Sequence, residues 1–415
     1  MLIPLAFIVL LTTLPPSKQP IGMALFAITA TFAPSIGPTL GGWLTESFSW
    51  RSIFYLNLVP GLLLLAAVWY AIAPQRSQLH RLRQGDWLGI LAMAIGLGCL
   101  QVVLEEGTRK DWFGSPLILT LSLLAAIFLT VFFWIELTHA HPFINLRLLR
   151  YRNFGIASVV NVGLGLGLYG SIFILPLYLS QIQGYNAMQI GEVLMWMGFP
   201  QLVIIPLIPK LMQRLAPRFL LAMGVSLFAI SCFMNATLTH DTGLEQLWLS
   251  QIVRALGQPL IMIPLATIAT AEIPPEQAGS ASGLFNMMRN LGGSLGIATL
   301  GTLLAQRQQL HASRLGEAIS LYNPQLQERL TQMTQYFTSQ GADLITAQQQ
   351  AIAAIDHLVR REAYLMAYDD CFYFIGCALL FSGITVIFFK PSRGRGVFRG
   401  ALTVAHGVTG KALFR

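Results

Sequence analysis

The sequence has little charge for its length. Only 11% of its 415 residues are Asp, Glu, Lys or Arg, whereas a soluble globular chain carries about 25%. In contrast, 54% of the residues are hydrophobic and the mean hydropathy is +0.62. A soluble domain is therefore excluded, and the composition indicates an integral membrane protein.

A secretory leader followed by a soluble domain is also excluded. No Lys or Arg precedes Lys18, and apolar runs continue along nearly the whole chain. The net charge of +8 comes from Lys and Arg residues spread over short segments between those runs. We therefore expect no nucleic-acid partner, because a basic binding surface would be concentrated in one exposed region.

The sequence also lacks the patterns of an enzyme. It shows no catalytic triad, no metal-ligand cluster and no phosphate-binding loop, so we expect no enzymatic activity, no cofactor and no metal. The four cysteines lie in apolar runs without metal-ligand spacing and are interpreted as core residues. They are Cys99, Cys232, Cys371 and Cys377.

Apolar runs of about 20 residues, the length that crosses a bilayer as a helix, recur throughout. They predict an all-α polytopic membrane protein with ten full spans. The predicted spans are 21–45, 52–73, 87–105, 115–137, 154–180, 187–209, 219–238, 246–270, 280–304 and 366–389. The apolar run 1–14 would reach only about 21 Å as a helix, which is less than the hydrocarbon core of about 30 Å. It is expected to be part of one further span.

The charges between the spans predict the orientation of the chain. Lys and Arg favour the cytoplasmic side, and they are concentrated in 74–86, 138–153, 210–218 and the tail after 389. The alternate segments carry no excess of basic residues and are expected outside; they are 105–114, 180–189 and 239–245. The segment 271–279 is an exception, because it has two Glu and no Lys or Arg. The C-terminus is predicted to be cytoplasmic.

A long polar segment covers residues 305–365. It is rich in Gln, and its acidic and basic residues are balanced. Stretches such as LITAQQQAIAAIDHLV have helical apolar spacing. We predict two or three amphipathic helices outside the membrane, interpreted as a solvated cap, with a docking surface for a partner as the alternative.

The run GLGLYG at 165–170 matches the G-x-G-x-x-G pattern of dinucleotide-binding proteins. That pattern requires a preceding strand, whereas this copy lies inside an apolar run. Glycines four residues apart instead predict close approach of neighbouring helices. The pairs with this spacing are Gly163/Gly167, Gly279/Gly283 and Gly292/Gly296.

The run FAPSIGPTLGGWL at 32–44 places two prolines and three glycines inside a predicted span. Ala33, Gly37 and Gly41 form one smooth stripe, while Pro34 and Pro38 bend the helix and free backbone carbonyls. Those carbonyls need partners within the protein. The helix is therefore expected inside a bundle.

Charged residues within spans are the candidate functional groups. Arg254 and Arg289 lie near the middle of their spans, where a charge costs about 2.5–3.5 kcal/mol, and are expected to face the interior. Glu192 and Asp370 are the candidates for a proton-carrying carboxylate or a substrate counter-ion. The alternative is a structural pair between one of these arginines and one of these acids.

Other polar residues in or near the spans have more general interpretations. Those that could line a cavity or bridge helices are Asn161, Gln201, Gln251, Gln258 and Asn286. Those expected in the headgroup region at span ends are Glu46, Glu105, Glu106, Glu136 and Asp369.

Four stretches carry a resemblance to a known family. They are GMALFAITATFAPSIGPTLGGWLTESFSWRSIFYLNLVPG at 22–61, LEEGTRKDWFGSP at 104–116, FINLRLLRYRNF at 143–154 and IPPEQAGSASGLFNMMRNLGGSLG at 273–296. In this order they resemble the 14-span drug:proton antiporters of the major facilitator superfamily, of the multidrug resistance protein B and quaternary-ammonium efflux type. The first stretch resembles the antiporter motif of that family, which here contains Gly37, Pro38, Gly41 and Gly42.

The resemblance implies a major facilitator fold without about the first three spans. Residues 1–73 would be the remaining part of the N-terminal half-bundle and 74–153 a central two-span hairpin with its flanking cytoplasmic loops. Residues 154–390 would form the C-terminal six-helix half with a periplasmic loop at 305–365, and 391–415 a cytoplasmic tail.

The resemblance also implies a function. We expect proton-coupled efflux of drugs or other amphipathic small molecules across the inner membrane, with a periplasmic adaptor and an outer-membrane channel as partners. One alternative is a truncated membrane remnant or assembly subunit that does not transport. Another is an exporter of one metabolite or siderophore.

Overall fold

The computed structural model describes residues 36–71, 86–139, 144–274, 277–318 and 324–389. Within these ranges every regular element is helical, which confirms the predicted all-α class. Eight helices of this part of the chain are long and apolar enough to cross a membrane. Residues 1–14 and most of the predicted span 21–45 lie outside the described residues.

The helices follow the predicted spans closely. Residues 36–47 are helical and are called the motif helix below. The α-helices that follow are α3 (Ser52–Leu56), α4 (Leu58–Ala71), α6 (Trp87–Glu106), α7 (Pro116–Thr138), α8 (Arg152–Gln181), α9 (Ala187–Met195), α10 (Phe199–Arg214), α11 (Pro217–Met234), α12 (Leu244–Thr270), α13 (Ala278–Ala318), α14 (Pro324–Ser339) and α15 (Leu344–Ile384). Short 3-10 helices are η1 (Trp112–Gly114), η2 (Leu146–Arg150) and η4 (Thr385–Phe388).

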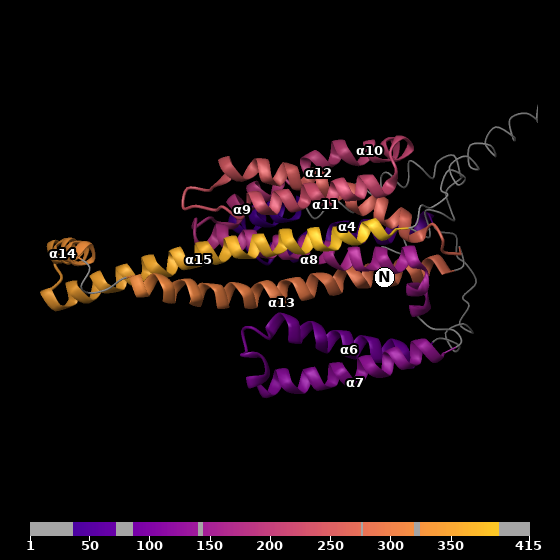
Figure 1. The fold of residues 1–415 in the computed structure, drawn as a ribbon, viewed down its shortest axis with the longest axis horizontal. Helices are drawn as coiled ribbons and strands as arrows, with labels where there is room; N and C mark the ends of the chain where they lie inside the picture. Colours follow the sequence, from indigo (N-terminus) through magenta and orange to yellow (C-terminus); the bar gives the residue numbers. More distant parts are fainter. Residues whose placement is uncertain (1–35, 72–85, 140–143, 275–276, 319–323, 390–415) are drawn as a thin grey trace, which may run out of the picture.

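The main bundle is formed by α8, α11, α12, α13 and α15, with α10 packed against α12 (Figure 1). Helix α8 contacts α12, α13 and α15, so it lies at the centre of the packing. The largest fully buried side chains are aromatic and come mainly from these helices: Phe132, Phe154, Tyr178, Phe228, Tyr368 and Phe372.

The predicted span 187–209 is two helices rather than one. Helix α9 starts at a capping box formed by Asn186 and Gln189 and ends at Met195. Helix α10 starts at Phe199 with a proline in its first turn. Pro200 has no backbone N–H to continue the α9 hydrogen-bond pattern, and the chain turns between the two helices.

Glycines bring α8 and α13 into direct contact. A Cβ atom added at Gly165 would overlap the carbonyl of Arg289, and one at Gly292 would overlap the carbonyl of Val162. A Cβ at Gly296 would lie 2.9 Å from Cα of Leu166. Close approach at Gly292 and Gly296 is therefore confirmed, and the GLGLYG run is a helix-packing face.

The other predicted glycine pairs behave differently from one another. Gly163 and Gly167 approach α15, where an added Cβ would lie 2.5 Å from Cβ of Ser382 and 2.9 Å from the Leu379 side chain, respectively. A Cβ at Gly283 would meet nothing within 4 Å. The prediction of close packing is therefore confirmed for Gly163 and Gly167 and wrong for Gly283.

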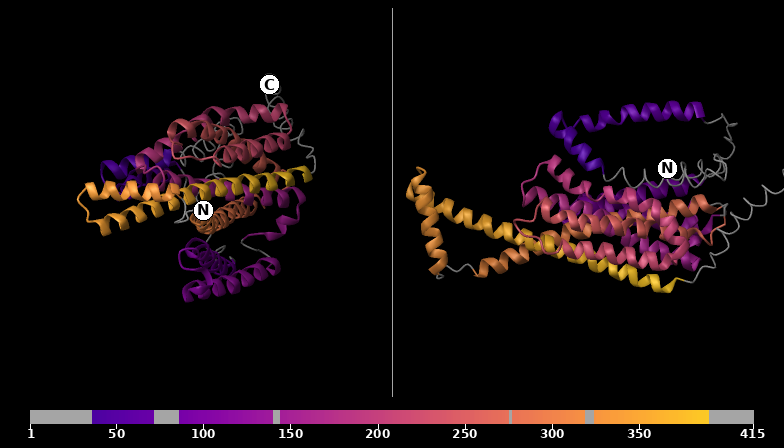
Figure 2. Two further views of the ribbon diagram at one scale, coloured as in Figure 1. Left: turned by 60° about the vertical axis from the view of Figure 1, so that its left-hand side comes forward. Right: turned by 90° about the horizontal axis from the view of Figure 1, so that it is seen from above.

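Two elements lie at the edge of the bundle. Helices α6 and α7 form an antiparallel hairpin that reaches the bundle through contacts between α6 and α13. Figure 2 shows α4 apart from the other helices, and none of its apolar residues from Leu58 to Tyr70 is buried. Within a bilayer this apolar surface faces lipid, which does not penalise its exposure.

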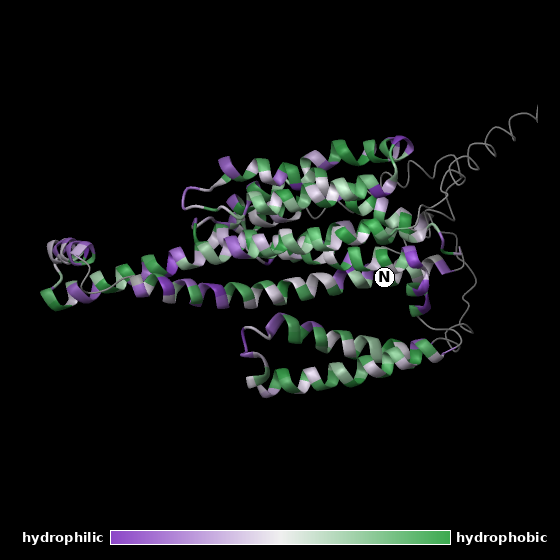
Figure 3. Ribbon diagram, viewed as in Figure 1, coloured by the Kyte–Doolittle hydropathy of each residue, from purple (hydrophilic) through white to green (hydrophobic). Residues whose placement is uncertain are grey.

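Helices α13 and α15 extend well beyond the apolar layer. Each has 41 residues, a length of about 60 Å that is twice the hydrocarbon thickness of about 30 Å. Their extensions and α14, which packs against α15, are called the stalk below (residues 305–318, 324–339 and 344–365). Figure 3 shows more hydrophilic residues on the stalk than on the bundle. The helices predicted for 305–365 are confirmed, but two of them continue bundle helices.

Two acidic residues at the predicted cytoplasmic end have packing roles. Glu136 is fully buried near the end of α7, and both of its carboxylate oxygens accept the backbone N–H of Ile144 at 3.2 Å. Its place at the depth of the headgroups stays a prediction. Glu272 lies in the segment 271–279, which was the exception to the charge pattern. It accepts a hydrogen bond of 2.8 Å from Asn153 of α8, so its carboxylate has a role in packing.

The cysteines are only partly in the core. Cys232 and Cys371 are buried, Cys99 is half-buried and Cys377 is exposed. The expectation of a core position is confirmed for the first two and wrong for Cys377, which lies on a face of α15 that points away from the bundle.

Candidate functional site

The motif helix packs directly against the start of α9. The hydroxyl of Thr39 donates a hydrogen bond of 2.7 Å to the carbonyl of Gly191. A Cβ atom at Gly191 would lie 2.5 Å from Cα of Thr39, and one at Gly42 would lie 2.7 Å from the carbonyl carbon of Ala187. We call these four residues the glycine contact. Both tight approaches are to backbone atoms, so no side-chain rotation could relieve an added methyl group.

The glycine contact uses a different face of the motif helix from the one expected. A Cβ at Gly37 would meet nothing within 4 Å, and one at Gly41 would meet only the Ile53 side chain at 3.9 Å. Thr39 and Gly42 are three residues apart and therefore share a face. The carbonyl of Pro38 also lies 3.0 Å from the position of a Cβ at Gly191. Ala33 and Pro34 lie outside the described residues.

Arg254 of α12 is buried in the bundle with only 2% of its surface exposed. Its Nη2 donates to the carbonyl of Leu168 at 3.3 Å, and its guanidinium carbon lies 5.3 Å from the ring centroid of Phe228. Its Nε has no hydrogen-bond partner within the described ranges. The charge is therefore held by a carbonyl dipole and an aromatic face.

Arg289 of α13 is half-buried beside α8. Its Nε donates to Oδ1 of Asn161 at 3.2 Å, and the Asn161 amide donates to the carbonyl of Phe285 at 2.6 Å. No described carboxylate forms an ion pair with Arg254 or Arg289. The alternative that one of these arginines forms an ion pair with Glu192 or Asp370 is therefore wrong.

Buried amides of α12 continue the polar surface of Arg254. Gln251 and Gln258 lie three residues before and four residues after Arg254, so the three side chains share one face of the helix. Gln258 accepts a hydrogen bond of 3.4 Å from Gln201 of α10. Gln201 and Gln258 therefore bridge α10 and α12, which was one of the two interpretations left open by the sequence. Gln251 instead donates a hydrogen bond to Ser250 of its own helix.

The two candidate carboxylates lie in different surroundings. Glu192 is half-buried next to Gly191 in the glycine contact, and it forms no hydrogen bond or ion pair with another described residue. Asp370 is engaged: its Oδ2 lies 2.8 Å from Nε2 of His311 and 3.5 Å from Nε of Arg307. This grouping could not be predicted from the sequence, because its partners lie on α13 about 60 residues earlier.

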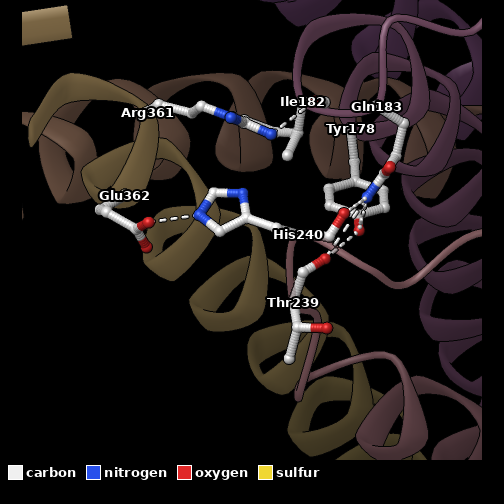
Figure 4. A network of polar contacts seen from close by, with 7 residues as sticks. All are labelled: Tyr178, Ile182, Gln183, Thr239, His240, Arg361 and Glu362. Carbon is white, nitrogen blue, oxygen red and sulfur yellow. Dashed lines mark hydrogen bonds and ion pairs between the residues drawn. The ribbon is translucent and has the colours of Figure 1, made fainter. Parts of the chain in front are cut away.

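A polar network joins the loops at the same end of the bundle to the base of the stalk (Figure 4). Nε2 of Gln183 donates to the hydroxyl of Tyr178 at 2.9 Å and to the carbonyl of His240 at 2.7 Å. The ring of His240 contacts the carboxylate of Glu362, and Arg361 donates to the carbonyl of Ile182 at 3.4 Å. Helix α15 is therefore fastened to both loops as it enters the stalk.

Known proteins resemble this chain over most of its length. The model of the Major Facilitator Superfamily matches residues 1–297. The multidrug export protein EmrB of Escherichia coli is 30% identical over 400 residues, which are 95% of this chain and 76% of that protein. The colistin resistance protein EmrB of Acinetobacter baumannii is 26% identical over 387 residues, which are 93% and 75% of the two chains.

Two further proteins are similar to this chain. The fatty acid resistance protein FarB of Neisseria gonorrhoeae is 28% identical over 372 residues, which are 89% of this chain and 71% of that protein. Among solved structures, a bacterial homologue of the human lysosomal transporter Spinster, inward-facing and occupied, has a TM-score of 0.47 at 16% identity and covers 92% of this chain and 71% of its own.

Proposed function

Because this chain belongs to the major facilitator superfamily, we propose that it is a secondary transporter that exports drugs or other amphipathic small molecules in exchange for protons. The observation that carries the proposal is the glycine contact between the motif helix and α9. It joins a helix of the predicted N-terminal half to a helix of the predicted C-terminal half. Secondary transporters work by moving two such halves against each other around a midplane site.

The glycine contact would act as a seal on the outward side. By the predicted topology, Gly42 lies near the outer end of its span and Ala187 follows an outer segment. Closure there needs backbones in contact, which Gly42 and Gly191 allow, and Thr39 adds a hydrogen bond that must break when the halves part. Of the four antiporter-motif residues, Gly42 and the carbonyl of Pro38 form the seal, while Gly37 and Gly41 would give the helix room to bend.

The candidate site residues would have separate roles. Glu192, a half-buried carboxylate beside the seal, is proposed to exchange a proton or to attract a cationic substrate. Asp370 is proposed to take part in proton exchange at the outer end. Arg289 is half-buried and is proposed to contact substrate, whereas Arg254 is enclosed in the bundle and is proposed not to contact substrate.

The protein is a multi-pass membrane protein. We further propose that the C-terminus is cytoplasmic and that the stalk lies in the periplasm. Several apolar side chains on the stalk are at least half exposed: Tyr336, Leu344, Ile345 and Ile352. They support docking of a periplasmic adaptor, and with it an outer-membrane channel.

The proposal is tested with purified protein in proteoliposomes carrying an imposed pH gradient. The substrate panel is ethidium, oleate and colistin, and a dye inside the vesicles reports proton movement. We expect at least one compound to move against its gradient while protons move in the opposite direction, and a collapsed pH gradient to stop both. Absence of coupled movement with every compound would contradict the proposal, and movement of a single metabolite would favour the specific exporter.

A further inference from the structure

A histidine lies at the point where α13 and α15 enter the stalk. His311 and Arg307 are four residues apart on α13, so both face α15. Nε2 of His311 and Nε of Arg307 approach the same oxygen of Asp370, at 2.8 Å and 3.5 Å. Only 11% of the His311 side chain is exposed, compared with 35% of Asp370 and 45% of Arg307. His311 is therefore the enclosed member of the group.

The chemistry of the three side chains gives them different responses to pH. Arginine stays charged in proteins, and an opposite charge within about 4–6 Å favours the ionised form of a carboxylate. Histidine is the side chain that ordinarily changes charge between pH 5 and 8. Neutral His311 would donate its Nε2 proton to Asp370, and an incoming proton would bind at Nδ1. The group then changes its net charge by one without losing the hydrogen bond.

Other titratable groups nearby are occupied by different contacts. On α15, Asp369 accepts the backbone N–H of Leu238 at 2.9 Å, and the thiol of Cys371 points to the carbonyl of Leu300 at 3.8 Å. On α13, Arg314 lies one turn beyond His311. Two turns along α15 toward the stalk tip are Arg361 and Glu362, the latter in contact with His240.

The second histidine at this end is less suited to accept a proton. Nδ1 of His240 is buried and has no hydrogen-bond partner among the residues described. Because Nε2 already contacts Glu362, a second proton would make Nδ1 a buried donor without a partner. An unpaired buried donor costs about 1–3 kcal/mol. The geometry therefore distinguishes His311 from His240.

We propose that His311, paired with Asp370 and flanked by Arg307, is the group that accepts a proton at the outer end of the bundle during transport. The inference rests on the proposed function, because it assigns one step of the proton exchange. It transfers that step from Asp370 alone to a histidine in the polar segment. The same α13 carries Gly292 and Gly296 in contact with α8, so a change of charge at His311 acts on a helix at the centre of the bundle.

The first test measures protonation directly. Protein labelled with 13C-histidine is titrated from pH 5 to 8 in nanodiscs, and the His311 resonance is identified by its loss in His311→Asn. If His311 accepts a proton, its resonance should change with pH in the wild type, and Asp370→Asn should alter that response because the imidazole Nε2 loses its carboxylate partner. The control Asp356→Asn removes an exposed carboxylate of the stalk that pairs with Arg360 and should leave the response of His311 unaltered.

The second test measures transport as the pH outside the predicted periplasmic face is varied. We expect the rate of His311→Asn, and of His311→Gln if the first variant is poorly folded, to lose its dependence on that pH between 5 and 8. The matched control His357→Asn, at an exposed position of the stalk, should keep the wild-type profile. The inference is overturned if the His311 resonance does not change with pH between 5 and 8, if Asp370→Asn leaves that response unaltered, or if both His311 variants keep the wild-type profile. If wild-type protein moves no protons, the proposed function is contradicted instead. The NMR measurement would still test whether His311 and Asp370 respond to pH as a pair.

Discussion

The substitution Gly42→Ala adds one methyl group to the glycine contact. Its Cβ would lie 2.7 Å from the carbonyl carbon of Ala187, whereas contacts under 3.0 Å require something to move. Both groups are backbone, so the motif helix and α9 must separate. The separation also strains the hydrogen bond from Thr39 to Gly191, which is 2.7 Å long.

The expected effect is large enough to change the balance between closed and open states. Added volume in a well-packed contact costs about 1–3 kcal/mol, and about 1.4 kcal/mol is a tenfold change in an equilibrium constant. The ratio of closed to open molecules should therefore fall roughly five- to 150-fold. The helix itself is not weakened, because alanine is favoured over glycine in a helix by about 1 kcal/mol.

The assay is passive leak and coupled efflux in proteoliposomes, with Gly37→Ala as the matched control. Gly37 lies on the same helix, and its added Cβ meets nothing within 4 Å. We expect Gly42→Ala to leak substrate and protons and to lose net efflux, while Gly37→Ala behaves as wild type. The reasoning is refuted if the two variants are equally active or equally impaired at equal amounts of folded protein.

Three further predictions concern the bundle. Gly292→Ala should lower the thermal unfolding temperature, because its methyl group would overlap the Val162 carbonyl at a cost of about 1–3 kcal/mol. The control Gly283→Ala, whose methyl group meets nothing within 4 Å, should not lower it. Equal decreases in the unfolding temperature of the two variants would contradict the proposed packing. Arg254→Met should leave the unfolding temperature unchanged or raise it, because it removes a buried charge that has no described carboxylate partner; a drop of several degrees would show that the contacts with Leu168 and Phe228 stabilise the bundle. Glu136→Ala should destabilise the α7 end by about 1–3 kcal/mol, because the Ile144 N–H loses its acceptor. In denaturant titrations Glu136→Gln, which keeps an acceptor oxygen, should be closer to wild type. Equal stability of the two variants would exclude the hydrogen bond as the cause.

Much of the fold could be predicted because membrane spans have a direct signature in the sequence. Runs of about 20 apolar residues identify helices without knowledge of their neighbours, and nearly every predicted span has a counterpart among the described helices. The break between α9 and α10 was missed, since an apolar run does not show where backbone hydrogen bonds stop. The stalk was only partly predicted, because amphipathic spacing indicates a helix without indicating that it continues a span.

The candidate site was harder to predict because it depends on contacts between distant segments. Gly42 and Gly37 have the same chemistry, and only the position of α9 makes one of them tight and leaves the other open. His311 and Asp370 are 59 residues apart in the sequence, and the polar run around His311 resembles any solvated loop. Gly292 and Gly296 were predicted correctly because four-residue spacing of small residues is itself the requirement for close packing.

The continuous helices α13 and α15 make the stalk a mechanical lever. About 30 Å of α15 (residues 344–365) and about 20 Å of α13 (residues 305–318) belong to the stalk. Because the helices are unbroken, a tilt of about 10° within the membrane would displace the far end by about 5 Å. A partner that binds the tip of the stalk would therefore have an affinity that depends on the conformation of the transport pathway. By the same coupling, binding of that partner would shift the conformational equilibrium of the pathway.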